Sequence, residues 1–118
     1  MQRRNLRITL DPDVSRFIRD AGRKAASRRY QGEILNFESV ELFLGRLTPL
    51  RWNLVRALLG AGELSIRELA RRVNRDVKRV HGDVAVLCEL GLVERTESFG
   101  VRCPFDDIHI DLHLRKAA

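Results

Sequence analysis

The sequence holds few residues of the kinds that mark secreted, disulfide-stapled or membrane-embedded proteins. Of its 118 residues, only two are cysteine, three are proline and one is tryptophan. No apolar run approaches the roughly 18 residues that a membrane span needs, and the N-terminus lacks the long apolar region of a signal peptide. Cys88 and Cys103 have no CxxC spacing, which indicates two buried thiols in a reducing cytosol. We therefore expect a cytoplasmic protein with no membrane partner.

A credible catalytic or metal-binding cluster is also lacking. His109, Asp111 and His113 alternate along a predicted strand, so they share one face. Cys103 is a conceivable further ligand, but nothing in the sequence fixes a closed metal geometry, and no nucleophile motif accompanies these residues. We expect this face to be a polar, solvent-facing strand or a subunit contact, and we expect neither an enzyme, nor a metal, nor a cofactor.

What the sequence has in excess is positive charge. The formal net charge is +6 and the sequence pI is about 10.3, which favours a polyanionic partner. The excess is uneven: residues 1–30 hold nine Arg and Lys against three Asp, whereas residues 31–50 hold one Arg against three Glu. The hydrophobic fraction of 44% is ordinary for a globular chain and is sufficient for a core.

The N-terminal segment, residues 1–36, has the pattern of a strand followed by a helix. An alternating row of apolar residues predicts a short strand, and Asp11-Pro12 is typical of a helix start. The following helix has an apolar face and otherwise basic faces. Both rows must pack on something, so we expect them to contact a partner or a second subunit through Leu6, Ile8, Leu10, Phe17, Ile18 and Ala21. Residues 33–37 predict another short strand.

Three further helices are predicted before the last one, which is described below. One is short, after Ser39; the next begins with Thr48-Pro49 and ends at residues 60–62. Its expected buried stripe consists of Trp52, Val55, Leu58 and Leu59. The third helix begins after Ser65. Ser65 and Glu68 have the spacing of a capping box, in which the serine accepts from first-turn amides and the glutamate reaches back to the cap. Ile66, Leu69, Ala70 and Val73 then form one apolar face.

The last helix has the features of a DNA-reading element. Asn74 suits a left-handed turn, Asp76 caps the helix and Gly91 ends it. An inner stripe contains Val80, Val84 and Leu87, which we expect to be buried together with Trp52 and Leu69. Residues 93–97 and 101–104 predict a hairpin around residues 98–100, and residues 108–114 predict a final strand.

The outward face of that helix is cationic at its N-terminal end, which is the end that contacts bases when such a helix enters a major groove. Asp83 lies four residues after Arg79, at the spacing of an ion pair, and Gly82 lets a groove wall approach the backbone. Basic residues of the preceding helix and turn suit phosphate contacts, and the hairpin adds one arginine on each side. The expected DNA-binding residues are Arg71, Arg72, Arg75, Lys78, Arg79, His81, Gly82, Arg95 and Arg102.

From Phe37 onward, the chain resembles the small winged-helix DNA-binding transcriptional regulators of bacteria and archaea. The matching phrases are FESVELFLGRLTPLRWNLVRALL, LSIRELARRVNRDVKRVHGDVAVLCELGLVERTE and CPFDDIHIDLHL. The resemblance implies a mainly α protein with small β elements: a winged helix-turn-helix domain at 37–118, preceded by the strand-helix segment at 1–36. Some similar proteins are antitoxins of type II toxin–antitoxin operons.

Two functions therefore stay open. The first is a sequence-specific repressor of transcription that binds double-stranded DNA as a homodimer through the helix at 76–90. The second is an antitoxin that binds a small cognate toxin and regulates its own operon. The two are compatible, because an antitoxin of that kind also binds its promoter.

Overall fold

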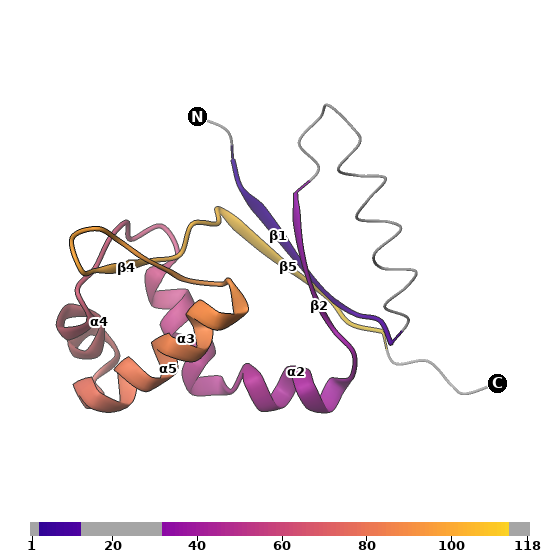
Figure 1. Ribbon diagram of the computed structural model, residues 1–118, viewed down its shortest axis with the longest axis horizontal. Coiled ribbons are helices and arrows are strands. Elements are labelled where there is room, and N and C mark those ends of the chain that lie inside the picture. Colours follow the sequence, from indigo (N-terminus) through magenta and orange to yellow (C-terminus); the bar gives the residue numbers. More distant parts are fainter. Residues whose placement is uncertain (1–2, 13–31, 114–118) are drawn as a thin grey trace. The chain divides into compact units, whose positions relative to one another are not determined.

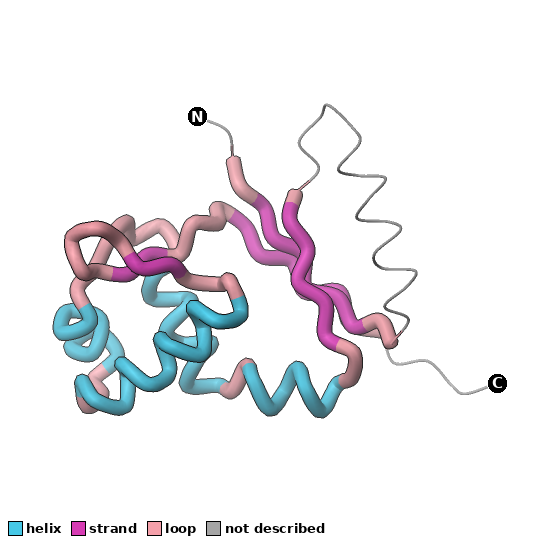
Figure 2. Tube along the Cα trace, viewed as in Figure 1, coloured by secondary structure: helices cyan, strands magenta, loops and turns pink. Residues whose placement is uncertain are grey.

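The computed structural model describes residues 3–12 and 32–113, and these form four helices and five strands, with more residues in the helices than in the strands (Figures 1 and 2). The chain divides into two compact units, which we call the sheet unit (Met1–Gly45 and Asp107–Ala118) and the helical unit (Arg46–Asp106). The described residues thus form a mixed α and β structure. None of their helices combines the length and the apolar character needed to cross a bilayer.

Three parallel strands form the sheet unit. They are β1 (Asn5–Leu10), β2 (Glu33–Phe37) and β5 (Asp107–Asp111), in the spatial order β2-β1-β5 (Figure 1). All three strands were expected from the sequence, β1 and β5 from their alternation. The pairing of β1 with β5 was not, because period-2 patterning identifies a strand but not its neighbour. The last strand therefore belongs with the N-terminal strand, which differs from the predicted division into 1–36 and 37–118.

The apolar row of β1 is already covered. Leu6 and Ile8 are 5% and 0% exposed, and Leu10 is half-buried. The sequence had suggested that these residues contact a partner. Because β1 is the central strand, they instead belong to the core. Phe17, Ile18 and Ala21, the other expected contact residues, lie outside the described residues.

Helix α2 (Val40–Arg46) links the two units along the chain. Its buried residue is Phe43, whose ring meets that of Phe37 edge to face, with centroids 5.4 Å apart. Such a pair is favourable because the positive edge of one ring meets the negative face of the other. The contact anchors α2 to the end of β2.

The helical unit contains α3 (Pro49–Leu58), α4 (Ile66–Val73), α5 (Val77–Leu90) and a two-stranded hairpin of β3 (Glu94–Arg95) and β4 (Val101–Arg102). The expected caps are confirmed: Thr48, Ser65 and Asp76 each accept from a first-turn amide. The helix ends also follow the prediction. Asn74 and Gly91 adopt left-handed conformations, with φ of 55° and 82°, a geometry that these residue types tolerate best.

The core of the helical unit confirms the predicted phase of α5. Val80, Val84 and Leu87 are fully buried, together with Leu69 of α4. Trp52 is half-buried, so its expected place among them is wrong.

The buried face of α3 explains the position of Trp52. The buried residues of this helix are Leu54, Val55 and Leu58. At about 100° per residue, the centre of that face passes through Arg51 and leaves Trp52 at its edge. An arginine thus occupies the central line of a core-facing helix surface, and it requires a buried partner.

We predict that Leu87→Ala lowers the free energy of unfolding by about 2–5 kcal/mol, through lost burial and the cavity left behind. Leu50→Ala is the matched control, because Leu50 is 51% exposed, and it should change stability by less than about 1 kcal/mol. Urea unfolding followed by circular dichroism measures both. Equal losses in the two variants would contradict the packing described here.

Candidate nucleic-acid interface

A groove opens between the starts of α4 and α5 and the hairpin. Its volume is about 470 Å³. Three basic side chains line it, from Arg67, His81 and Arg95, beside the apolar Ile66 and Val77. Among the described residues that line it, none is acidic. The groove therefore offers positive charge and hydrogen-bond donors over an apolar floor.

The first turns of α5 present exposed basic residues. Lys78, Arg79 and His81 are all exposed, and the carboxylate of Asp76 accepts from the backbone N–H of Arg79 at 3.2 Å. A helix N-terminus carries partial positive charge, so it adds to the attraction for an anion. Gly82 is also exposed, and a Cβ built there would meet nothing within 4 Å. Nothing within the described chain therefore requires glycine at this position.

The hairpin is fixed to the segment that precedes α4. Leu64 and Val101 exchange two backbone hydrogen bonds, of 2.9 and 2.8 Å. Gly100 is buried where a Cβ would lie 2.6 Å from the Glu63 carboxylate and 3.0 Å from the Leu64 carbonyl oxygen, so a larger residue would force the Glu63 side chain to move and would crowd the Leu64 carbonyl. Phe99, at the tip, is 95% exposed with φ of 64°. The hairpin is thus held at its base and presents an aromatic ring at its tip.

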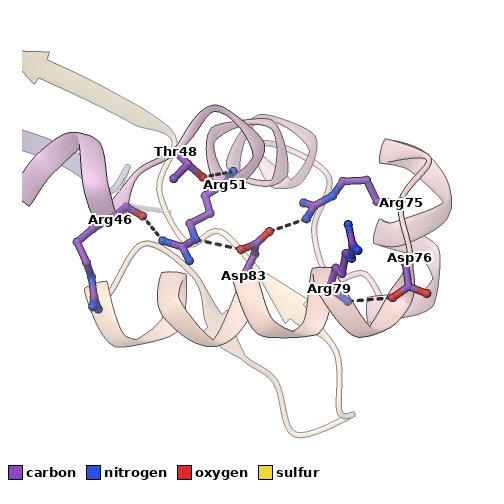
Figure 3. A network of polar contacts seen from close by, with 7 residues as sticks. All are labelled: Arg46, Thr48, Arg51, Arg75, Asp76, Arg79 and Asp83. Atoms are coloured by element: carbon purple, nitrogen blue, oxygen red, sulfur yellow. Dashed lines mark hydrogen bonds and ion pairs between the residues drawn. The ribbon is translucent and has the colours of Figure 1, made fainter.

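A partly buried carboxylate organises the side of the helical unit that contains α3 and the turn before α5. Asp83 accepts from Arg51 Nε at 3.0 Å and from Arg75 Nη2 at 2.7 Å (Figure 3). Arg51 Nη1 also donates to the carbonyl oxygen of Arg46 at 2.9 Å. The side chains of Arg51, Asp83 and Arg75 are only 21%, 17% and 16% exposed. One carboxylate therefore ties α3, the α4–α5 turn and α5 together.

The electrostatics of Asp83 reflect both burial and pairing. Burial alone would raise the pKa of its carboxyl, but the hydrogen bonds and charges of Arg75 and Arg51 outweigh burial and hold the pKa below its usual value. Arg75 Nη1 is buried and has no hydrogen-bond partner within the described chain. The expected pair of Asp83 with Arg79 is not formed, because Arg51 and Arg75 occupy the carboxylate.

Helix α4 carries a second, exposed ion cluster. Glu68 accepts from Arg71 Nε at 2.9 Å and from Arg72 Nε at 3.1 Å. These contacts lower the pKa of Glu68 to about 2. Ser65 caps the helix as predicted, by accepting from the Glu68 N–H. The carboxylate of Glu68 serves the two arginines, however, and does not complete the expected capping box.

The predicted DNA-binding residues therefore fall into three groups. Lys78, Arg79, His81, Gly82 and Arg95 are exposed at the start of α5 and on the hairpin. A second group is exposed to varying degrees and ion-paired within the chain: Arg71 and Arg72 to Glu68, and Arg102 to Glu94 at 2.6 Å. Arg75 forms the third, since its side chain is mostly buried against Asp83.

Sequence reasoning missed Arg67, which is exposed and lines the groove. The signal that could have identified it is its spacing. Arg67 precedes Arg71 by four residues and lies off the apolar stripe of α4, so both arginines share one outer face of the helix.

The remaining candidate residues form no metal centre. Asp111 contacts Arg7 Nη2 at 3.3 Å and His113 Nε2 at 3.0 Å. Within residues 3–12 and 32–113, no three His, Cys, Asp or Glu side chains gather closely enough to hold a metal ion. Cys88 and Cys103 are half-buried rather than fully buried, and burial raises the pKa of the Cys88 thiol.

We predict that Asp83→Asn lowers the free energy of unfolding by about 1–3 kcal/mol near neutral pH, because two partly buried guanidinium groups lose their carboxylate. The folded-state pKa of Asp83 is depressed, so its contribution is present above the ordinary value of 3.8 and is lost as the pH falls through the folded value. The difference in the free energy of unfolding between variant and wild type should therefore become smaller in acid. Unfolding curves across pH 2–7 test this, and Glu97→Gln, at an exposed position, is the control. A difference in the free energy of unfolding that does not change with pH would contradict the prediction.

One family of known proteins matches this chain. Residues 46–110 match the family model HVO_A0114, a range that contains the whole helical unit and the first residues of β5. No curated protein and no solved structure is similar enough to this chain to count as a match. The family's designation states neither an activity nor a ligand. Since the match covers more than half of the 118 residues, the chain belongs to the HVO_A0114 family.

Proposed function

We propose that the helical unit is a winged helix-turn-helix module that binds double-stranded DNA and acts as a sequence-specific transcriptional repressor. Three features support the fold assignment. Helices α4 and α5 are joined by the short turn at Asn74–Asp76, α3 packs against both, and the hairpin stands where a wing would be. In such modules, the second helix of the pair enters the major groove.

The observation that carries the proposal is the concentration of exposed cations at one end of α5 and along the adjoining groove. Lys78 and Arg79 lie in the first turn of α5, while Arg67, His81 and Arg95 line the groove that connects α5 with the hairpin. Of the acidic side chains nearby, Asp83 is held by Arg51 and Arg75, Glu68 is held by Arg71 and Arg72, and Asp76 caps the same end of α5. A surface of this kind matches the phosphate backbone and the acceptor atoms of guanine.

The proposed contacts are of two kinds, to base edges and to phosphates. Lys78 and Arg79 lie on the first turn of α5, so they are assigned to base edges in the major groove. Arg67 and Arg71 lie on α4, and Arg95 lies on the hairpin, positions that suit phosphates. Arg75, expected from the sequence to contact DNA, is here a structural residue because Asp83 holds it.

We predict that Lys78→Ala and Arg79→Ala each reduce affinity for the cognate promoter by about 1–3 kcal/mol and relax sequence preference. Arg67→Ala should weaken all duplexes alike and reduce the slope of log K against log salt by about one. The matched control is Arg56→Ala, which removes the same charge from an exposed position on α3 outside the groove. Fluorescence anisotropy with the gene's own promoter and a scrambled duplex measures these effects. If the folded Lys78→Ala/Arg79→Ala variant binds as wild type does, α5 is not the reading helix.

Gly82 provides a test in which stability and affinity move in opposite directions. Alanine is the better helix former, so Gly82→Ala should raise the free energy of unfolding by about 0.5–1 kcal/mol. The added methyl group should nevertheless weaken DNA binding, because it occupies the space that a groove wall needs. Gly45→Ala in α2 is the control, since it also meets open space, and it should leave DNA binding unchanged. Tighter or unchanged binding by Gly82→Ala would contradict close approach of DNA to α5.

A further inference from the structure

We propose that β5 is a dimerisation strand, which pairs in antiparallel fashion with β5 of a second copy of this chain. In the part of the chain that the structure describes, β5 is an edge strand with β1 on one side only. An edge strand presents unpaired N–H and C=O groups and is a template for another strand. This inference concerns the sheet unit and does not depend on the proposed DNA binding.

The apolar face of β5 is incompletely covered. Ile110 is 41% exposed and Leu112 is 48% exposed, whereas Ile8, the β1 partner of Ile110, is fully buried. The two exposed side chains lie on the same face of the strand because their spacing is two. The apolar layer of the sheet thus continues past its core to the open edge.

The sequence of this segment is complementary to itself. Residues 107–113 read Asp-Ile-His-Ile-Asp-Leu-His. In a two-fold antiparallel pair centred on Ile110, Ile110 meets its own copy and Ile108 meets Leu112, all on the apolar face. On the opposite face, His109 meets Asp111 and Asp107 meets His113. Every cross-strand pair is therefore either apolar with apolar or histidine with aspartate, the combinations that stabilise strand pairing.

Two other registers, centred on Ile108 or on Leu112, keep such pairs but form fewer of them within residues 107–113, and the remaining registers lack this complementarity. Centring the pair on Asp111 places two aspartates opposite each other and His109 opposite His113. Centring it on His109 places Asp107 opposite Asp111. A shift by one residue puts isoleucine opposite aspartate and mixes the two faces. The composition thus favours a second copy as the partner, in the register centred on Ile110, which forms the most complementary pairs within residues 107–113.

The polar face is already arranged for such a partner. The carboxylate of Asp111 lies on this face, where Arg7 of β1 and His113 contact its two oxygens. Arg7 approaches from the inner side of the sheet, so the open edge is left to histidine. In the dimer, His109 of the second copy takes the place of His113 at Asp111, and His113 turns to Asp107 of the second copy.

An isologous contact of this kind closes on itself, because each residue of the pair occurs twice about the two-fold axis. The two three-stranded sheets then form one six-stranded sheet. No free edge remains at β5, so the contact gives a dimer and not a filament.

The test is sedimentation velocity of the full chain over a range of concentrations. The wild type should sediment as a dimer, and Ile110→Lys should weaken the dimer at least ten-fold, because it places two ammonium groups opposite each other on an apolar face. Leu50→Lys is the control: Leu50 is exposed but lies on α3, and the variant should remain dimeric. A monomeric wild type, or an Ile110→Lys variant as dimeric as the wild type, would overturn the proposal.

A charge exchange keeps the proposal testable if Ile110→Lys fails to fold. His113→Asp places two aspartates opposite each other at both ends of the pair, and Asp107→Lys places lysine opposite histidine, so each variant alone should dimerise roughly ten-fold more weakly. Mixed, they restore one lysine–aspartate and one aspartate–histidine pair. Preferential heterodimer formation on mixing is expected. Equal association of the two variants alone and mixed would overturn the register.

Discussion

The shared carboxylate of Asp83 is the interaction on which the helical unit depends. Three of its helices meet around residues that are otherwise apolar, yet α3 places Arg51 at the centre of its buried face and the α4–α5 turn brings in Arg75. A guanidinium group cannot lose its charge in a protein, so both must be compensated where they lie. Asp83 does this for both, with its two oxygens at 3.0 and 2.7 Å from their donors (Figure 3).

This arrangement separates two kinds of arginine that look alike in a sequence. Arg51 and Arg75 hold the helices at fixed relative positions, whereas Lys78, Arg79 and Arg67 remain at the surface near the groove. Since Arg51 and Arg75 hold the Asp83 carboxylate, it does not pair with the exposed basic residues at the start of α5. The pairing that stabilises the module thus also preserves the positive charge of the surface assigned to DNA.

The sequence predicted most of the local structure, because the signals are local. The caps at Thr48, Ser65 and Asp76 and the left-handed ends at Asn74 and Gly91 depend only on neighbouring residues, and the buried stripe of α5 depends only on helical period. The predictions that did not hold required knowledge of distant partners. Alternation could not show that β1 pairs with β5. Spacing suggested Arg79 for Asp83, but burial favoured Arg51 and Arg75, and Arg67 was missed because its groove is formed by three separate segments.

The most direct test of the central claim is a titration of the ¹⁵N-labelled full chain with the gene's own promoter duplex, followed residue by residue by NMR. The largest amide shift changes are expected on residues 66–67, 77–82 and 95–99, and they should shrink as salt is raised. The Asp83 cluster should respond less, because its side chains are already paired. Shift changes confined to the sheet unit, or none at low salt, would contradict the account.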